Sequence, residues 1–167
     1  MTARTRARAA TPQPSLAHEP TSEAARTLYV AEPRPLWLAR PPVVADCSVL
    51  AAMLFAEPQA DDAMALLARR AVHAPTLLPY ELASVGLKKR RAGATPAEVD
   101  TALGDFAEQR IELHPAPAAA VSALAAQHGL SVYDAAYLWL AAELQAPLAT
   151  FDQRLARAAQ QHLGRSE

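Results

Sequence analysis

Residues 43–167 alternate short apolar runs with longer segments of helical spacing, and this alternation limits the fold more than any other feature of the chain. The apolar runs fall at residues 43–45, 72–74, 111–113 and 148–150. Runs this short, each with at most one polar residue, are typical of strands that are buried on both faces. Strands that alternate with helices form parallel sheets covered by helices. We therefore expect an α/β fold with three layers, α/β/α, around a short parallel sheet of about four strands.

Start and stop signals divide the intervening segments into helices. We expect helices at residues 49–55, 60–70, 80–91, 116–128, 131–144 and 152–163, and one more that begins at residue 96. The clearest start is Thr95, which together with Glu98 matches the capping-box pattern. In the segment 60–70, we expect Met64, Leu66 and Leu67 to form the buried stripe.

The first 42 residues have a different composition from the rest. They hold seven of the 14 prolines, six arginines and three glutamates, so their net charge is +3. Prolines at this density prevent long helices and central strands. We expect residues 1–42 to form a disordered or loosely attached arm and residues 43–167 to form the folded domain. A start codon assigned too early, or a resemblance to an organelle transit peptide, is an alternative explanation of the arm.

Charge, cysteine content and hydropathy exclude several classes of protein. Residues 43–167 carry ten basic and fourteen acidic groups, a net charge of −4, which argues against a simple basic nucleic-acid binder. Cys47 is the only cysteine, so an internal disulfide framework is excluded and a reducing cytoplasm is the expected location; we expect Cys47 to be a small core residue. No apolar run approaches the roughly 18 residues of a membrane span, so we expect no membrane association.

Other counts exclude common phosphate-handling folds and an obvious histidine metal site. The five glycines fit neither a dinucleotide fingerprint nor a P-loop. Lys88 and Lys89 are the only lysines, so receiver domains and haloacid-dehalogenase-like phosphatases lack the lysine that they need at a later strand end. The histidines, at positions 18, 73, 114, 128 and 162, show no paired metal spacing and are interpreted as scattered surface or packing residues.

Four acids lie where predicted strands end or predicted helices begin. Asp46 ends the first strand, Asp152 follows the last one, and Glu81 and Asp134 open two helices. One explanation is structural, because a carboxylate in a first helical turn binds free N–H groups and favours the positive end of the helix dipole. The other is functional, because sites in open parallel sheets form outside the carboxyl ends of the strands.

A gathering of all four acids at one edge of the sheet would have a chemical consequence. Their mutual repulsion would require a cation, and a set of oxygen ligands selects a hard ion such as Mg²⁺ or Mn²⁺. Such an ion lowers the pKa of a bound water and offsets the charge of a phosphodiester. The chemistry predicted on this condition is metal-dependent hydrolysis of phosphodiester bonds.

Short patterns around these acids resemble a known family. In chain order, the patterns are Asp46-x-Ser48, Glu81 on a helix with a basic end, Ser131-x-Tyr133-Asp134-Ala135-x-Tyr137 and Thr150-x-Asp152-x-x-Leu155. Together, over about residues 43–163, they resemble the PIN-domain ribonucleases, in particular the VapC toxins of bacterial toxin–antitoxin pairs. The resemblance implies a homodimer that cleaves RNA at a Mg²⁺ site and is restrained by a small cognate antitoxin.

The resemblance also implies roles for single residues. It assigns the catalytic and metal-binding positions to four acids, Asp46, Glu81, Asp134 and Asp152. In this assignment the three aspartates ligate the metal, and Glu81 binds it through water or orients the attacking water. Two further residues, Ser48 and Thr150, are implied to be supporting polar groups.

Three features depart from the family pattern. Members commonly have Asn three residues after the helix acid, where this chain has Ser84. Many members close with an apolar strand after the final helix, whereas residues 164–167 are polar, so we expect four strands and no fifth. The proline-rich arm is not a usual family feature.

A basic run, Lys88-Lys89-Arg90-Arg91, lies on the same predicted helix as Glu81, roughly 10–15 Å further along it at 1.5 Å per residue. The run could hold RNA phosphates, which position a nucleic acid without reading its sequence. It could equally be a solvated helix end, where cations favour the negative end of the dipole.

Two functional hypotheses follow from the sequence. The first is a Mg²⁺-dependent endoribonuclease, with Mn²⁺ as a substitute ion, that acts as the toxin of a toxin–antitoxin pair. The alternative is a non-catalytic PIN-like scaffold that binds RNA or a protein partner, for which Ser84 and the unusual arm are the hints. The sequence identifies neither the RNA, nor the bond that is cleaved, nor the antitoxin.

Overall fold

The computed structural model of the chain describes residues 40–164. The strands in this part are β1 (Pro42–Ala45), β2 (Ala71–Pro75), β3 (Ile111–His114) and β4 (Leu148–Ala149). The helices are α1 (Cys47–Leu54), α2 (Ala60–Leu67), α3 (Leu78–Arg91), α4 (Pro96–Glu108), α5 (Ala118–His128), α6 (Val132–Glu143) and α7 (Gln153–Leu163). None of these helices is long and apolar enough to cross a membrane. The predicted arm, residues 1–42, lies outside the described residues except for its last three positions.

The four strands form one parallel sheet in the order β3-β2-β1-β4. The chain adds β2 and β3 on one side of β1 and then returns to add β4 on the other side. In open α/β sheets, ligands bind outside the carboxyl ends of the strands at such a change of direction. The residues that follow β1 and β4 are Asp46 and Thr150. The topology therefore places two of the predicted site residues at the position where a site is expected.

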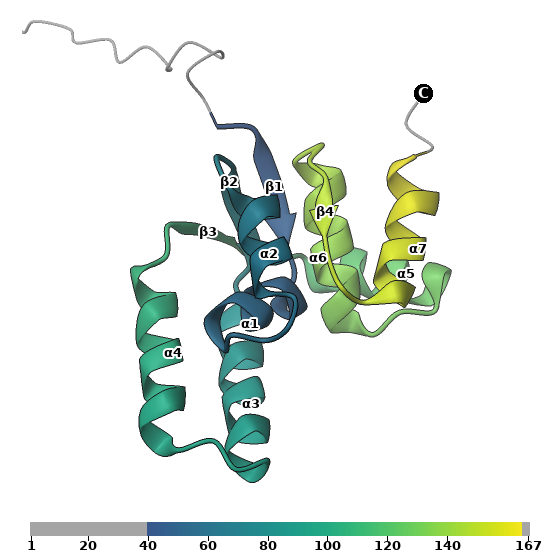
Figure 1. Cartoon of the computed structure of the whole chain (residues 1–167). Coiled ribbons are helices and arrows are strands. Elements are labelled where there is room, and N and C mark those ends of the chain that lie inside the picture. Colours follow the sequence, from purple (N-terminus) through teal and green to yellow (C-terminus); the bar gives the residue numbers. More distant parts are fainter. Residues whose placement is uncertain (1–39, 165–167) are drawn as a thin grey trace, which may run out of the picture. The chain divides into compact units, whose positions relative to one another are not determined.

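Helices cover both faces of the sheet, as the sequence predicts. Val43 packs in a cluster with Val49 of α1 and Ala63 of α2. Val44 packs in a larger cluster that includes Leu138 of α6. Because neighbouring residues of a strand point to opposite faces, β1 is buried from both sides. Figure 1 shows α1 and α2 in front of β1, and α6 contacts β1, β2 and β4. The fold has the three predicted layers, α/β/α.

The predicted buried stripe of α2 is wrong for Met64 and Leu66, whereas Leu67 is partly buried against the core. Met64 and Leu66 are 49% and 44% exposed, whereas Ala63 is fully buried. At 100° per residue, Ala63 and Leu67 point in nearly the same direction, and Met64 and Leu66 flank that direction on either side. The small side chain of Ala63 lets α2 approach the sheet closely, so the larger side chains remain at the surface.

α3 and α4 form an antiparallel pair that extends away from the sheet (Figure 1). Gly86 permits their close approach, because a Cβ at this position would lie 2.7 Å from Cγ1 of Val99 on α4. The predicted capping box is confirmed at the start of α4. Oγ1 of Thr95 accepts the N–H of Glu98, and the Glu98 carboxylate accepts the N–H of Thr95. Packing against α4 thus supports α3, the helix that carries Glu81.

Candidate active site at the carboxyl ends of β1 and β4

Asp46 is the first residue after β1 and the N-cap of α1. It is 5% exposed and is the one charged residue among those described that the core buries. Its Oδ1 accepts the N–H and the hydroxyl of Ser48, both at 2.6 Å, and the N–H of Val49 at 3.3 Å. These donors fix the orientation of the carboxylate and offset the free energy of its desolvation.

A threonine hydroxyl connects Asp46 to Asp152. Oγ1 of Thr150 donates to Oδ2 of Asp46 at 2.5 Å and accepts the N–H of Asp152 at 2.9 Å. Ser48 makes a second connection, because its Oγ accepts the N–H of Phe151 at 2.9 Å. Asp152 is the N-cap of α7. The segments that follow β1 and β4 are therefore joined through side chains, including both residues that the sequence predicts as supporting groups.

Glu81 lies in the first turn of α3 and receives a hydrogen bond from α6. The hydroxyl of Tyr137 donates to Oε2 of Glu81 at 2.5 Å. Tyr137 is 1% exposed, so its phenol is a fixed donor. Burial, together with the hydrogen bond to Glu81, raises the pKa of the Tyr137 phenol, which keeps the proton on it.

Asp134 lies in the first turn of α6, one turn before Tyr137. Its Oδ2 accepts the hydroxyl of Ser131 at 2.7 Å, and its N–H donates to the same Oγ at 3.0 Å. Ser131 is thereby the N-cap of the helix. The start of α6 thus supplies both an acid and the tyrosine that holds Glu81.

The acids influence one another electrostatically. Burial raises the pKa of Asp46, while the hydroxyl and N–H donors around it lower that pKa. Burial also raises the pKa of Glu81, the hydrogen bond from Tyr137 lowers it, and the negative charges of Asp46 and Asp134 raise it further. Like charges act in this way only when they are close. Asp46 and Asp134 thus lie within electrostatic range of Glu81, and the threonine hydroxyl links Asp152 to Asp46.

The spacing of the four acids limits how they could hold a metal. Within residues 40–164, the one set of three His, Cys, Asp or Glu donors that all lie within 4.8 Å of one another is found elsewhere, on β2 and β3. Mg²⁺ is usually bound by one or two carboxylates and keeps several waters. The donor set consists of carboxylate oxygens, which suit a hard ion that keeps part of its water.

Comparison with known proteins places this arrangement in a family. A family model of the PIN domain matches residues 43–161. The chain belongs to the PIN-domain family. The sequence resemblance is confirmed, and the four acids lie within the matched residues.

Named relatives agree with this family assignment. Two proteins called Ribonuclease VapC3, from the CDC 1551 / Oshkosh and ATCC 25618 / H37Rv strains of Mycobacterium tuberculosis, are each 36% identical to the chain over 118 residues. The match covers 70% of this chain and 86% of each relative. The crystal structure of PAE2754 from Pyrobaculum aerophilum matches with a TM-score of 0.57 and 22% identity, over 79% of this chain and 95% of that chain. This last match shows that the two proteins share a fold.

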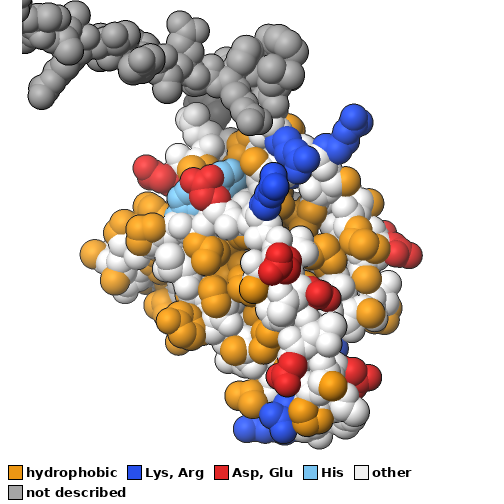
Figure 2. Space-filling model, turned by 90° about the vertical axis from the view of Figure 1, so that its left-hand side faces the viewer, with side chains coloured by type: hydrophobic (Ala, Val, Ile, Leu, Met, Phe, Trp, Pro, Cys, Tyr) orange, Lys and Arg blue, Asp and Glu red, His pale blue; other side chains and the backbone are white. Residues whose placement is uncertain are grey.

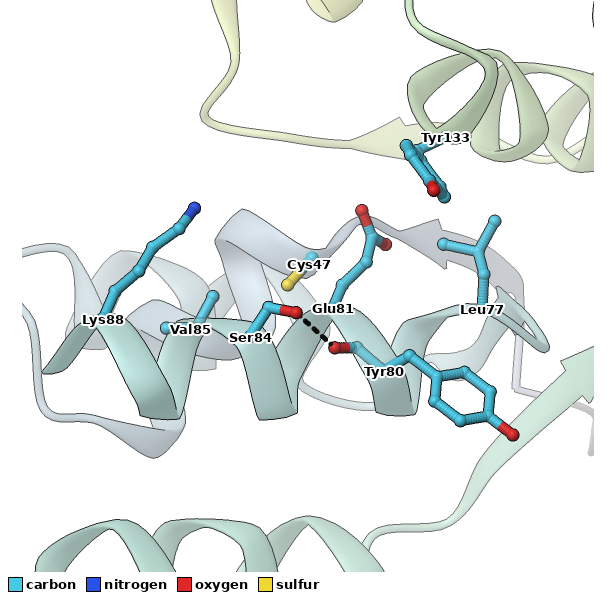
Figure 3. A pocket seen from close by; sticks show the side chains of 8 residues that line it. All are labelled: Cys47, Leu77, Tyr80, Glu81, Ser84, Val85, Lys88 and Tyr133. Carbon is cyan, nitrogen blue, oxygen red and sulfur yellow. Dashed lines mark hydrogen bonds between the residues drawn. The ribbon is translucent and has the colours of Figure 1, made fainter. Parts of the chain in front are cut away.

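A cavity of about 590 Å³ lies beside Glu81 in this PIN domain. It is lined by Cys47, Leu77, Tyr80, Glu81, Ser84, Val85, Lys88 and Tyr133 (Figure 3). Figure 3 shows the Glu81 carboxylate and the Lys88 ammonium directed to the same side of α3. Burial, with the charges of Glu81 and Asp46, raises the pKa of the Cys47 thiol to about 12, so the thiol stays protonated near neutral pH. Cys47 is half-buried and packs against the core, in agreement with the predicted structural role.

Ser84 occupies the position where members of the family commonly have Asn. Its hydroxyl donates to the carbonyl oxygen of Tyr80, one turn earlier, at 2.9 Å (Figure 3). The donor is therefore directed back along its own helix, and its reach toward the acids is shorter than that of an amide side chain.

The side chains of the basic run at the end of α3 lie in different environments. Lys88 lines the cavity. Nζ of Lys89 lies 2.6 Å from Oε1 of Glu57 and 5.8 Å from the centroid of the Phe55 ring, so this lysine fixes α3 to the segment after α1. The two arginines of the run are exposed in the last turn of α3.

Sequence reasoning missed two histidine pairs. Nδ1 of His73 lies 3.0 Å from Nε2 of His114, and Nε2 of His128 lies 3.3 Å from Nδ1 of His162. The interpretation of these four histidines as scattered residues is wrong. The partners are 41 and 34 positions apart, so no local spacing reveals them. His114 directly follows the predicted strand 111–113, and the observed extension of β3 by one residue puts its side chain on the same face as that of Glu112.

Proposed function

We propose that this PIN domain is a Mg²⁺-dependent endoribonuclease that hydrolyses RNA phosphodiester bonds in the cytoplasm. Its catalytic and metal-binding residues would be Asp46, Glu81, Asp134 and Asp152. The observation that supports the proposal is the link between Asp46 and Asp152 through Thr150 at the carboxyl ends of β1 and β4, together with the electrostatic effect of Asp46 and Asp134 on Glu81. The relatives named as ribonucleases support the same reaction. Mn²⁺ would substitute for Mg²⁺, because both ions prefer oxygen ligands.

The proposed role of each residue follows from the contacts that hold its side chain. When bound, Mg²⁺ would lower the pKa of a water molecule and offset the charge of the phosphodiester. The three aspartates would hold the ion, and the hydroxyls of Ser48 and Thr150 keep Asp46 in one orientation. Glu81 would orient the attacking water, and its raised pKa increases its capacity to accept a proton. Tyr137 fixes the position of that carboxylate.

The basic run supports RNA binding to unequal extents. Lys88 would bind an RNA phosphate, because it lines the same cavity as Glu81. Arg90 and Arg91 would extend the basic surface along α3. Lys89 would contribute its charge alone, since its ammonium is already paired with Glu57. Contacts of this kind position the RNA without selecting its sequence.

Cleavage of total RNA by the purified full chain tests the proposal. We expect cleavage in Mg²⁺ or Mn²⁺, its loss in EDTA, and a fall of at least about 100-fold in Asp46→Asn, which removes a charge from the site. Asp100→Asn is the matched control, because Asp100 is exposed on α4. Cleavage that is insensitive to EDTA and equal in wild type and Asp46→Asn would overturn the enzyme assignment.

We further propose that the protein is the toxin of a toxin–antitoxin pair and acts as a homodimer. The described surface has large apolar side chains available to a partner near the cavity, with Tyr80 78% exposed and Tyr133 58% exposed. Induced expression should arrest growth in wild type but not in Asp46→Asn, and co-expression of a small neighbouring open reading frame should restore growth. Light scattering of the purified protein would measure the oligomeric state, and a monomeric mass would contradict the dimer.

The alternative of a non-catalytic PIN-like scaffold makes a different prediction for the metal. The environment of Ser84 is the observation in its favour, because the hydroxyl is engaged within α3. Calorimetric titration with Mn²⁺ separates the two functions. The nuclease should bind Mn²⁺ with an affinity that falls in Asp152→Asn, whereas a scaffold should show no specific binding in either protein.

A further inference from the structure

A second group of ligand side chains lies within the sheet, on β2 and β3. Nδ1 of His73 and Nε2 of His114 are 3.0 Å apart. The two carboxylate oxygens of Glu112 lie 3.6 Å from the His73 nitrogen and 3.7 Å from the His114 nitrogen. One donor atom from each residue therefore belongs to a compact set in which all atoms lie within 4.8 Å of one another.

The strand register holds the three side chains in place. His73 is the direct neighbour of Glu112 across the β2–β3 pairing, and Pro75 is the neighbour of His114. Glu112 and His114 are two residues apart on β3, so their side chains point to the same face. The side chains of His73 and His114 are 13% and 23% exposed, whereas that of Glu112 is 68% exposed. Two ordered imidazoles thus stand beside a carboxylate that reaches into solvent.

The surface is accessible on this side of the molecule. Figure 2 shows histidine side chains beside acidic ones on the surface in a view from the side of Figure 1 where β3 and α4 lie. An ion could therefore reach the nitrogens from solvent without opening the fold.

The donor spacing matches a tetrahedral transition-metal centre. With metal–ligand distances of about 2.0–2.1 Å, two ligands of a tetrahedral zinc ion lie about 3.4 Å apart. The two nitrogens are 3.0 Å apart, and each has one Glu112 oxygen close to that value, Oε2 at 3.6 Å from His73 and Oε1 at 3.7 Å from His114. Imidazole nitrogens favour zinc, copper or nickel over Mg²⁺.

We propose that His73, Glu112 and His114 bind one divalent transition-metal ion of the zinc class, with a fourth coordination position open to water. This site is separate from the acids at the ends of β1 and β4 in ligand type and in position on the sheet. The ion would join β2 to β3 through side chains. It would thereby hold together the two ends of the segment between these strands, which contains α3 and α4. A ligand that binds the folded protein and not the unfolded chain raises the melting temperature.

Titration of the EDTA-treated, dialysed full chain with Zn²⁺ tests the site, in the presence of excess Mg²⁺. We expect one equivalent of Zn²⁺ to bind to wild type and to raise its melting temperature. The affinity should fall at least about 10-fold in Glu112→Gln and further in His114→Gln. Co²⁺ in place of Zn²⁺ should give the visible absorption of a tetrahedral centre in wild type only.

The second histidine pair supplies the matched control. His128→Gln changes one imidazole of the pair with His162 and should leave Zn²⁺ binding unchanged. Glu112→Gln decides the test if His114→Gln does not fold, because Glu112 is mostly exposed. No binding to wild type, equal binding in wild type and Glu112→Gln, or loss of binding in Asp46→Asn would overturn the proposal.

Discussion

The acids beyond β1 and β4 and the histidine cluster of β2 and β3 differ in where their side chains originate. The acids come from loops and first helical turns at the ends of strands, and hydroxyls from other elements hold them. His73, Glu112 and His114 come from within two paired strands, and their side chains contact one another. In the acid cluster, Asp46 is buried, whereas in the histidine cluster the charged group, Glu112, is exposed.

This difference teaches how one sheet can present two kinds of ligand set. At the ends of strands, ligand oxygens come from several helices and loops. Their arrangement therefore depends on several hydrogen bonds and leaves room for water. Strand interiors hold donors in a register that the backbone fixes, so the set is compact. The first arrangement suits a hard ion with its own waters, and the second suits a borderline ion with few ligands. Disturbing one connection should therefore affect the acid cluster more than the histidine cluster.

Among changes to single connections within the two clusters, the largest effect is expected from Thr150→Val, which removes the hydroxyl that connects Asp46 to Asp152. The side chains are nearly isosteric, so the change acts on hydrogen bonds. A hydrogen bond to a charged group contributes about 1.5–3 kcal/mol, which corresponds to a roughly 10- to 100-fold fall in RNA cleavage. Single-turnover cleavage of a labelled RNA measures this fall in rate, and Thr101→Val, at an exposed position, is the control. A change of less than twofold would show that this connection does not organise the acids.

Tyr137→Phe tests whether the core supports Glu81. The variant removes the donor to Oε2 of Glu81 and leaves a half-buried carboxylate without it. We expect the free energy of unfolding at pH 7 to fall by about 1.5–3 kcal/mol. Urea denaturation measures this value, and Tyr133→Phe, at an exposed position, is the matched control. Equal effects of the two substitutions would contradict a structural role for the hydroxyl.

The pH dependence of stability should have opposite signs in the two clusters. In metal-free protein, the raised pKa of Asp46 means that the folded state binds the proton more tightly than the unfolded chain. Its stabilising contribution is present below the ordinary carboxyl pKa and is lost as pH rises through the raised value. The lowered pKa of His73 has the reverse effect, because its contribution is lost as pH falls below the ordinary histidine pKa.

Denaturation in EDTA at several pH values measures the first of these effects. The difference in unfolding free energy between wild type and Asp46→Asn isolates the carboxyl group. We expect wild type to lose stability relative to the variant as pH rises from about 4 toward neutrality. A relative gain over that range would contradict the raised pKa of Asp46.

Two adjacent lysines provide a smaller and more selective comparison. Lys88→Ala should weaken RNA binding a few-fold with little change in stability, because the side chain lines the cavity. Lys89→Ala should lower the free energy of unfolding by about 0.5–1 kcal/mol and change RNA affinity less, because it breaks contacts with Glu57 and Phe55. Fluorescence anisotropy in an Asp46→Asn background measures affinity without cleavage. Equal affinity losses in both variants would contradict this division.

The smallest effect is expected from Glu112→Gln in metal-free protein. The carboxylate is 68% exposed, and its partners His73 and His114 are only partly exposed imidazoles on adjacent strands. An exposed pair of this kind contributes about 0–1 kcal/mol to stability. Thermal denaturation in EDTA measures the change. A loss of stability larger than that in Tyr137→Phe would contradict the expectation that the acid cluster depends more on single contacts than the histidine cluster does.

The sequence predicts this fold well where a local pattern determines the structure. The four short runs form strands, and the capping box at Thr95 and the acids after β1 and β4 are local features found where expected. The expected burial of every strand on both faces is wrong for β3, where Leu113 is 39% exposed. The orientation of α2 was predicted wrongly because the buried position belongs to Ala63, whose small size makes it uninformative in a hydrophobic pattern. Burial of that helix depends on how closely it approaches the sheet, which the segment alone does not encode.

The candidate site was partly predictable for a similar reason. The topological rule for parallel sheets identifies the acids, but it does not reveal that Thr150 bridges two of them or that Tyr137 holds Glu81. These contacts join residues 104 and 56 positions apart. The pairing of His73 with His114 depends on the register of β2 with β3. Register is a property of two segments together, so neither segment shows it alone.

β4 is only two residues long and pairs with β1 alone. The hydroxyl of Thr150 and the carboxylate of Asp46 therefore do more than arrange acids, because they also fasten the shortest strand to its neighbour. Amide exchange at Phe151 and Asp152 should report opening of this edge and disassembly of the acid cluster as one event. A fluctuation that frays the sheet here would also remove the arrangement of acids on which the proposed nuclease depends.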